Sequence, residues 1–307
     1  METLIQQIVN GLVLGAVYAL VALGYTMVYG ILGLINFAHG EVVMVGALVT
    51  LAVIKPLAAA GVPAVALLPL GLIVAMLVCM ALGATVERIA YRPLRNAPRL
   101  APLITAIGVS IVLQYGAVLI WGRGYHAYPE LLPTTPLEFF GARISPTQIA
   151  IVLVSSLIMA GLLWLVHRTR LGRAMRATAE NPAVARLMGV NVDQVISLTF
   201  VIGSALGAVA GVLVSINYSV AHYQMGFTLG LKAFTAAVLG GIGNLGGAMV
   251  GGLLLGLIEA LGAGYIGDLT GGLFGSNYRD VFAFLVLVAV LIFRPSGLLG
   301  ERVAERA

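Results

Sequence analysis

The 307-residue chain is poor in charge and nearly without lysine and cysteine. Charged residues make up 9% of it and hydrophobic residues 60%, whereas a soluble domain carries about 25% charged residues. This composition excludes an ordinary soluble globular protein. The single cysteine, Cys79, excludes an intrachain disulfide. Because its neighbours in the sequence are apolar, we predict a packed side chain and no redox chemistry.

Motifs for nucleotide or metal chemistry are missing as well. No G-x-x-x-x-G-K-[ST] sequence occurs, and the only lysines are Lys55 and Lys232, so ATP hydrolysis by a P-loop mechanism is excluded. The segment "GIGNLG" (241–246) fits G-x-G-x-x-G but lies in an apolar run, so we expect a break between half-helices there. His39 and Glu41 are too few for a metal site. We predict no catalytic residues, no cofactor and no metal.

The sequence has long apolar runs instead. A run of about 20 apolar residues matches the hydrocarbon thickness of a bilayer, and the alternation typical of a membrane β-barrel is absent. We therefore predict an all-α polytopic transmembrane bundle of about eight spans, forming one domain over residues 1–307. The apolar segments are 8–30, 31–54, 63–90, 101–121, 147–167, 193–217, 230–264 and 280–293.

Two segments predict broken or re-entrant helices. The stretch 230–264 is too long for one simple span and rich in glycine, which indicates two short spans or a re-entrant hairpin. Residues 31–41 are either part of a span or a re-entrant piece. A faint internal repeat, with first members running in opposite directions as in inverted repeats, pairs 15–25 and 34–48 with 203–213 and 240–254.

Glycines spaced four apart predict close helix packing, with a sliding surface as the alternative. They are Gly203, Gly207 and Gly211, then Gly247 with Gly251, and Gly252 with Gly256.

Arginines gather in three places, and the positive-inside rule puts all three on the cytoplasmic side. Counting spans backward then puts the N-terminus outside, whereas a loop or re-entrant piece at 31–41 would change that side. The largest outer loop is 122–146. The clusters are Arg88, Arg92, Arg95 and Arg99; Arg168, Arg170, Arg173, Arg176 and Arg186; and Arg294, Arg302 and Arg306.

The segment "AENPAVARLMGVN" (179–191) predicts a short helix inside the second arginine cluster. Asn181 is a good N-cap, Pro182 suits the first helical position, and Gly189 suits the end. A helix of about two turns is not stable alone in water. Its apolar face must therefore be covered, either by the membrane surface or by a groove on a cytoplasmic partner. That face consists of Val184, Leu187 and Met188.

The chain resembles LivH-type permease subunits of bacterial ABC importers for branched-chain amino acids, nearly end to end. The resemblance is carried by "GYTMVYGILGLINFAHGE" (24–41), "ERIAYRPLR" (87–95), "LGRAMRATAENPAVARLMGVN" (171–191), "LTFVIGSALGAVAGVL" (198–213) and "KAFTAAVLGGIGNLGGAMVGG" (232–252).

The resemblance implies a binding-protein-dependent transport system of the bacterial inner membrane. Its partners would be a homologous permease subunit in a hetero- or homodimer, two ATP-binding cassette subunits and a periplasmic substrate-binding protein. It also implies a coupling helix in the cytoplasmic loop at about 168–192, which docks into an ATP-hydrolysing subunit. Its expected residues are Glu180, Asn181, Pro182, Val184, Arg186, Leu187, Met188 and Gly189.

Five polar residues lie in or near apolar runs, where each needs a partner or water. They form either a structural network, with Lys232 paired to Glu41 or Glu259, or part of the substrate path. On a helix, Asn36, His39 and Gly40 would share a face. The five residues are Asn36, His39, Glu41, Lys232 and Glu259.

Arg123 and Arg143 flank the outer loop. The resemblance implies that a binding protein docks on that side, so these arginines are candidates for contacting it. The alternative is that they reach to lipid headgroups.

We therefore expect a permease subunit and not an enzyme, with the lipid bilayer as a partner and no nucleic acid. The expected cargo is branched-chain amino acids. The alternatives are the same importer architecture for urea, an amide or another amino acid, or a self-sufficient secondary transporter or channel.

Overall fold

The computed structural model describes residues 2–95, 97–98, 100–129, 135–139, 141–271 and 278–300. Arg99, Arg302 and Arg306 of the arginine clusters lie outside the described residues. Long helices form nearly all of the rest, so the predicted all-α bundle is confirmed. The elements are α1 (Glu2–Leu32), α2 (His39–Ala59), α3 (Ala64–Val86), the π-helical turn η1 (Glu87–Tyr91), the 3-10 turn η2 (Arg92–Leu94), α4 (Leu100–Trp121), β1 (His126–Ala127), β2 (Leu137–Phe139), β3 (Ala142–Ile144), α5 (Pro146–Arg168), α6 (Arg170–Glu180), α7 (Pro182–Leu187), α8 (Val192–Tyr218), β4 (Val220–Ala221), α9 (Met225–Gly240), α10 (Leu245–Leu269) and α11 (Arg279–Phe293).

Among the described residues, 7 helices are long and apolar enough to cross a membrane. Two shorter apolar helices, Met225–Gly240 and Ala283–Phe293, accompany them. The segment 230–264 divides into α9 and α10 at residues 241–244. Gly241 and Gly243 have φ of 108° and 96° there, which favours glycine. The expected break is thus confirmed.

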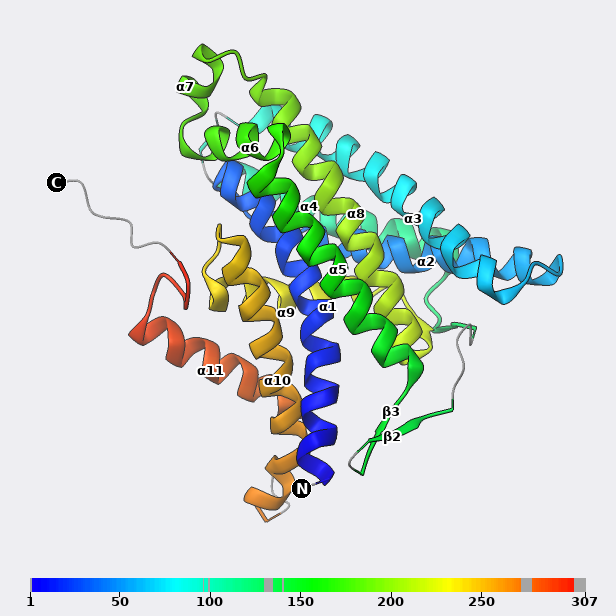
Figure 1. The fold of residues 1–307 in the computed structure, drawn as a ribbon. Helices are drawn as coiled ribbons and strands as arrows, with labels where there is room; N and C mark the ends of the chain where they lie inside the picture. Colours follow the sequence, from blue (N-terminus) through cyan, green and yellow to red (C-terminus); the bar gives the residue numbers. More distant parts are fainter. Residues whose placement is uncertain are drawn as a thin grey trace.

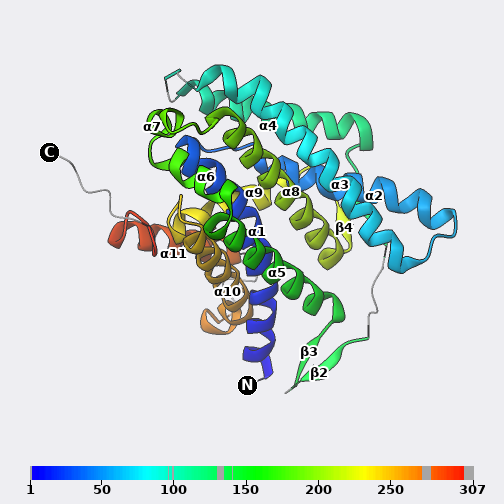
Figure 2. The same cartoon turned by 45° about the horizontal axis from the view of Figure 1, so that its top comes forward.

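Helix α1 stands at the centre of the bundle, with its beginning near the β2–β3 hairpin (Figure 1). Turning the molecule shows α6 and α7 together at the opposite end (Figure 2). We call these the hairpin end and the α7 end. Residues 19–23 of α1 are fully buried, at 0% exposure. Helix α10 runs antiparallel to α1, because Gly252 packs on Ala19 and Gly264 packs on Gln7.

Helix α2 begins inside the bundle. Its first residue, His39, packs on Gly24 in the second half of α1, with 5.0 Å between the ring centroids of Tyr25 and His39. The link 33–38 therefore turns back from the end of α1 into the interior, and the apolar segment 31–54 is not one span. Asn36 lies in this link, so the prediction that it shares a helix face with His39 is wrong.

Helix α9 begins inside the bundle as well. Gly226 packs on the backbone of Gly40 at the start of α2, and Gly230 lies beside Gly40 and the hydroxyl of Tyr25. Helices α2 and α9 therefore meet at their first turns. The link 33–38 leads into α2, and the link 219–224 leads into α9.

The order of helices supports the inverted repeat. Helices α1 and α10 pack together, and α8 and α3 pack together in the matching way, with Ser204 of α8 against Gly83 of α3. The counterpart of α2 is α9, so the pairing of 34–48 with 240–254 is wrong. The glycines of 240–254 belong to a turn and to the packing face of α10, which is why they matched by composition alone.

The predicted glycine contacts are confirmed. Gly211 of α8 lies against the carbonyl of Val43, while Gly203 and Gly207 border the ring of His39. Gly256 of α10 lies against the backbone of Gly15 in α1. Small residues let these backbones approach closely, which is how helices associate where lipid removes the hydrophobic driving force.

Gly256→Val tests this packing. The added side chain overlaps the backbone of Gly15, and overpacking costs about 1–3 kcal/mol. We expect a lower midpoint for thermal loss of the monodisperse peak of the detergent-solubilised protein. Gly116→Val is the matched control, because nothing lies within 4 Å of a Cβ placed there. Equal midpoints for the two variants would contradict the packing role of Gly256.

Candidate functional site

Helix α7 has the ends that the sequence predicts. The side-chain oxygen of Asn181 accepts hydrogen bonds from the backbone N–H groups of Ala183 and Val184 at 3.0 and 3.1 Å. Pro182 occupies the first helical position. Gly189 ends the helix with a φ of 84°, and the N–H of Val190 donates to the carbonyl of Ala185 at 3.0 Å. The short helix is therefore closed at both ends by its own sequence.

The apolar face of α7 is uncovered in the single chain. Val184, Leu187 and Met188 are 52%, 87% and 80% exposed, and within α7 only Ala185 is buried. Exposed apolar faces of this kind mark interaction sites. Glu180 and Arg186 are also exposed beside it. The segment lies at the α7 end and not among the long helices (Figure 1).

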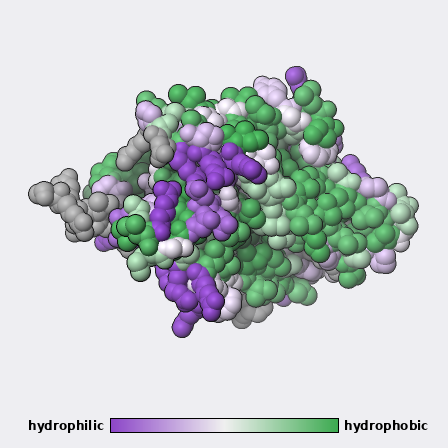
Figure 3. All heavy atoms as spheres, turned by 90° about the horizontal axis from the view of Figure 1, so that it is seen from above, coloured by the Kyte–Doolittle hydropathy of each residue, from purple (hydrophilic) through white to green (hydrophobic). Residues whose placement is uncertain are grey.

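The surface at the α7 end is strongly polar. Hydrophilic residues gather there between green hydrophobic flanks (Figure 3). The described arginines of the first two predicted clusters contribute to this polarity, because they lie in or directly after η1, η2, the end of α5, α6 and α7, whereas Arg294 of the third cluster follows α11. Those that are exposed are Arg88, Arg92, Arg168, Arg170, Arg173, Arg176, Arg186 and Arg294.

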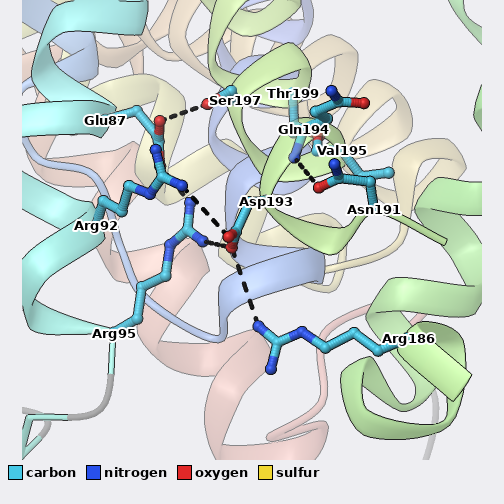
Figure 4. Close-up of polar contacts among 10 residues, drawn as sticks. All are labelled: Glu87, Arg92, Arg95, Arg186, Asn191, Asp193, Gln194, Val195, Ser197 and Thr199. Atoms are coloured by element: carbon cyan, nitrogen blue, oxygen red, sulfur yellow. Dashed lines mark hydrogen bonds and ion pairs between the residues drawn. The ribbon is translucent and has the colours of Figure 1, made fainter.

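An ionic cluster ties α7 to the long helices (Figure 4). Its centre is Asp193 in the first turn of α8, which receives arginines from α7, η2 and the residue after η2. The arginine after η2 also pairs with Glu87, which is 1% exposed. The contacts to Asp193 are Arg186 at 3.9 Å, Arg92 at 3.3 Å and Arg95 at 2.5 Å; Glu87 is bound by Arg95 and, at 2.5 Å, by the hydroxyl of Ser197.

The acidic members of this cluster were not among the predicted site residues. A signal was available, because Glu87 directly precedes the first arginine cluster and Asp193 follows the second. Asp193 meets Arg92 and Arg95 across 101 and 98 positions, however, and Glu87 meets Ser197 across 110 positions. Pattern alone does not reveal such contacts. The cluster joins α7 to the ends of α3 and α8.

A tight elbow holds α6 against α5. The side chain of Thr169 accepts from the N–H of Gly172 at 3.1 Å, and its hydroxyl donates to the carbonyl of Leu165 at 2.6 Å. Gly172 packs directly on the carbonyls of Leu165 and Val166, where a larger residue would clash. Helix α7 is thus connected stiffly to α5 on one side and to α8 on the other.

Lys232 pairs with Glu259, one of the two alternatives that the sequence left open. Its ammonium lies 3.0 Å from Oε2 of Glu259 and 2.7 Å from Oδ1 of Asp280. The hydroxyl of Tyr18 donates to the same Oε2 at 2.9 Å. These contacts join α1, α9, α10 and α11 inside the bundle. Asp280 was not predicted as a member.

The other predicted polar residues lie apart from this group. Asn36 accepts from the hydroxyl of Tyr91 at 3.0 Å, and Glu41 accepts from Ser110 at 3.1 Å through Oε1. His39 fits between glycines of α1 and α8. The five residues therefore do not form one cluster. Within the described ranges, no group of three metal-ligating side chains occurs.

The two outer arginines lie at the hairpin end. Arg143 is on β3, where it pairs with Glu138 of β2 at 3.5 Å, and both side chains are more than 70% exposed. Arg123 follows α4 and is exposed. No carboxylate of the described residues lies within ion-pair distance of it.

The chain just after Arg123 is held against the link before α9. Strand β1 pairs antiparallel with β4, with His126 opposite Ala221. The rings of Tyr125 and His222 lie 4.8 Å apart, and burial lowers the pKa of His222.

Comparison with known proteins agrees with this architecture. The chain is 50% identical to the high-affinity branched-chain amino acid transport system permease protein BraD of Pseudomonas aeruginosa, over 98% of this chain and 97% of that protein. It is 47% identical to the LivH permease protein of the corresponding system of Salmonella typhimurium, with the same coverage. At lower similarity, it is 31% identical to the autoinducer 2 import system permease protein LsrC of Escherichia coli, over 62% of this chain and 55% of that protein.

A family model described as the permease component of branched-chain amino acid transport systems matches residues 7–291. The match covers α2, α9, the ionic cluster and α7. The chain is therefore a multi-pass membrane protein that belongs to the family of branched-chain amino acid transport system permease components.

Proposed function

We propose that this chain is a permease subunit of an ATP-driven importer of branched-chain amino acids in the bacterial inner membrane. The observation that carries the proposal is the exposed apolar face of the short helix α7, where Leu187 is 87% exposed. The chain that bears this helix lacks a P-loop motif. Such a chain depends on ATPase subunits for its energy, and α7 provides a surface that these subunits can bind. The names of the full-length relatives support the cargo.

The coupling role falls on α7 and its flanks. ATP closes the nucleotide-binding subunits on each other, and a helix seated in each of them moves with its seat. The apolar contact with the partner is made by Val184, Leu187 and Met188. The helix itself is stabilised at its start by Asn181 and Pro182. Glu180, Arg186 and Gly189 border the same surface. The ionic cluster around Asp193 then carries the movement to α3 and α8.

The proposed assembly contains a homologous permease subunit, two ATP-binding cassette subunits and a periplasmic binding protein. The binding protein docks at the hairpin end, where Arg123 and Arg143 are exposed and meet acidic residues on it. Buried Asn36, His39 and Glu41 serve the structure, because each supports the start of α2 or the link before it. The permease pair is a hetero- or homodimer.

A second candidate cargo is another small solute. The similarity to LsrC, an autoinducer 2 import system permease, favours this candidate because one architecture serves chemically different molecules. Urea, an amide or a different amino acid belong to the same class. A secondary transporter or channel is the remaining alternative, and it differs in needing no ATPase.

Reconstitution distinguishes these functions. We expect proteoliposomes holding the complete assembly and loaded binding protein to accumulate labelled leucine when ATP is supplied. Vesicles holding only this chain are expected to take up none, with or without an ion gradient. Urea and acetamide serve as the comparison solutes. Ion-driven uptake by the chain alone would contradict the proposed class, and preference for urea or acetamide would contradict the proposed cargo.

Leu187→Glu tests the coupling role of α7. A carboxylate on the exposed apolar face must be desolvated to enter the partner's groove, so we expect leucine uptake to fall to background. Membrane insertion should not change, because Leu187 is 87% exposed in the single chain. Leu299→Glu is the control, since Leu299 is also exposed, at 50%, but lies outside α7. Normal uptake in Leu187→Glu would remove the coupling proposal.

Asp193→Asn tests the ionic cluster. It weakens three contacts to arginines, and exposed ion pairs contribute about 0.2–1 kcal/mol each. We expect backbone amides of residues 185–190 to exchange with deuterium roughly two- to fivefold faster, because local opening becomes easier. Glu138→Gln, at the hairpin end, is the control. Unchanged exchange in Asp193→Asn would show that α7 is held by the chain connections alone.

A further inference from the structure

A cavity of about 330 Å³ lies near the hairpin end, between α1, α5, α8 and α10. This volume falls in the range of small-molecule sites, about 300–1,000 Å³. One wall is apolar, formed by residues such as Val13 and Leu14. The other residues that matter are polar: Gln7, Asn10, Asn217 and Glu259. The cavity is thus mixed in character, and it reaches the buried ion pair of Lys232.

Only one carboxylate oxygen of Glu259 is hydrogen-bonded within the described residues. Its Oε2 is taken by Lys232 and Tyr18, whereas Oε1 is buried and has no hydrogen-bond partner among the described residues. The residue is 1% exposed and lines the cavity. A buried oxygen without a donor is costly, so this position favours a ligand that brings one.

The charges around Glu259 favour a cationic donor. Glu259 shares the one ammonium group of Lys232 with a second carboxylate, that of Asp280, while its own charge is buried at 1% exposure. Removing such a charge from water costs free energy unless it is paired. A small ammonium group at Oε1 would complete the pairing.

The amides of the cavity suit the other end of a zwitterion. No hydrogen bond joins the side chains of Gln7 and Asn217 to other described residues. The oxygen of Asn10 accepts from Gln6 and Gln148, both at 3.2 Å, which leaves its Nδ2 as a donor. Three amide groups thus offer N–H donors to a carboxylate, and the lining contains no lysine or arginine.

The inner end of the cavity is narrow and mostly apolar. A second cavity of about 20 Å³ shares Val13, Leu14, Asn217 and Tyr218 with the first and continues to Val17, Val214 and Leu229. This space holds about one water molecule. An aliphatic side chain facing inward would meet these apolar walls, and it could advance only if α1, α8 and α9 moved apart.

We propose that this cavity is a transit site for an α-amino acid, in which Glu259 receives the ammonium group through Oε1. Gln7, Asn10 and Asn217 receive the carboxylate, and the aliphatic side chain faces the apolar inner end. The inference rests on the proposed function, which it deepens by naming residues of this chain that contact the cargo on its way.

A photoreactive probe tests the site directly. The complete assembly, in nanodiscs and without ATP, is illuminated with a diazirine analogue of L-leucine, and the labelled peptides are mapped by mass spectrometry. We expect labels within 13–17, 214–218 and 259–263. L-leucine should displace the probe at least about tenfold better than 4-methylpentanoate, which lacks the ammonium group, because a charged hydrogen bond is lost.

The variant Glu259→Gln removes the charge but keeps the shape, and Lys232 retains Asp280 as a partner. We expect labelling of these segments to fall about tenfold or more. Glu41→Gln is the matched control, because Glu41 is equally buried at 1% exposure and does not line the cavity. It should label as the unmodified chain does.

Several results would overturn the proposal: labels elsewhere, full labelling of Glu259→Gln, equal displacement by 4-methylpentanoate, or displacement by sodium ions. If Glu259→Gln fails to assemble, the displacement series on the unmodified assembly still decides. Labelling needs no ATP and no turnover. Labelled cavity residues without ATP-driven leucine uptake would therefore count against the proposed function and not against the site.

Discussion

Close backbone contact between glycine-bearing helices is the interaction on which the rest of this structure depends. Lipid tails are as apolar as the helices, so burial alone does not hold a bundle together in a membrane. Gly256 on Gly15 and Gly211 on Val43 bring backbones together instead. The first turns of α2 and α9 lie within the same packed centre, where Gly226 meets Gly40. Helices α2 and α9 can begin in the interior only because such close packing surrounds them.

The charged residues around this centre form two groups, and each group has its own structural role. At the α7 end, Asp193 and Glu87 bind arginines and secure a short helix that is mostly exposed. In the interior, Lys232 joins α9 to α10 and α11. The first group connects the exposed helix to α3 and α8, and the second fixes helices that border the cavity. Movement at one end can therefore reach the other through elements that are individually rigid.

Sequence alone predicted the long helices, because apolar runs of bilayer length leave few alternatives. It also predicted both ends of α7 from Asn181, Pro182 and Gly189, since caps act locally. It missed the start of α2, because residues 33–38 are as apolar as the helices around them and differ only in what they pack on. Asp280 was missed because its partner Lys232 is remote in the chain, and Ser197, which donates its hydroxyl to Glu87, is remote from Glu87 as well. The hydrophobicity of a segment indicates that it lies in the membrane. It does not show which helices contact each other, and these contacts are seen only in the structure.

The short ladder between β1 and β4 has a mechanical consequence. It clamps the chain just after α4 to the link that leads into α9, and the Tyr125 and His222 rings reinforce the clamp. Only three residues separate β4 from the beginning of α9. A displacement of the segment after α4 is therefore transmitted to the start of α9, because the link between β4 and α9 is too short to absorb it.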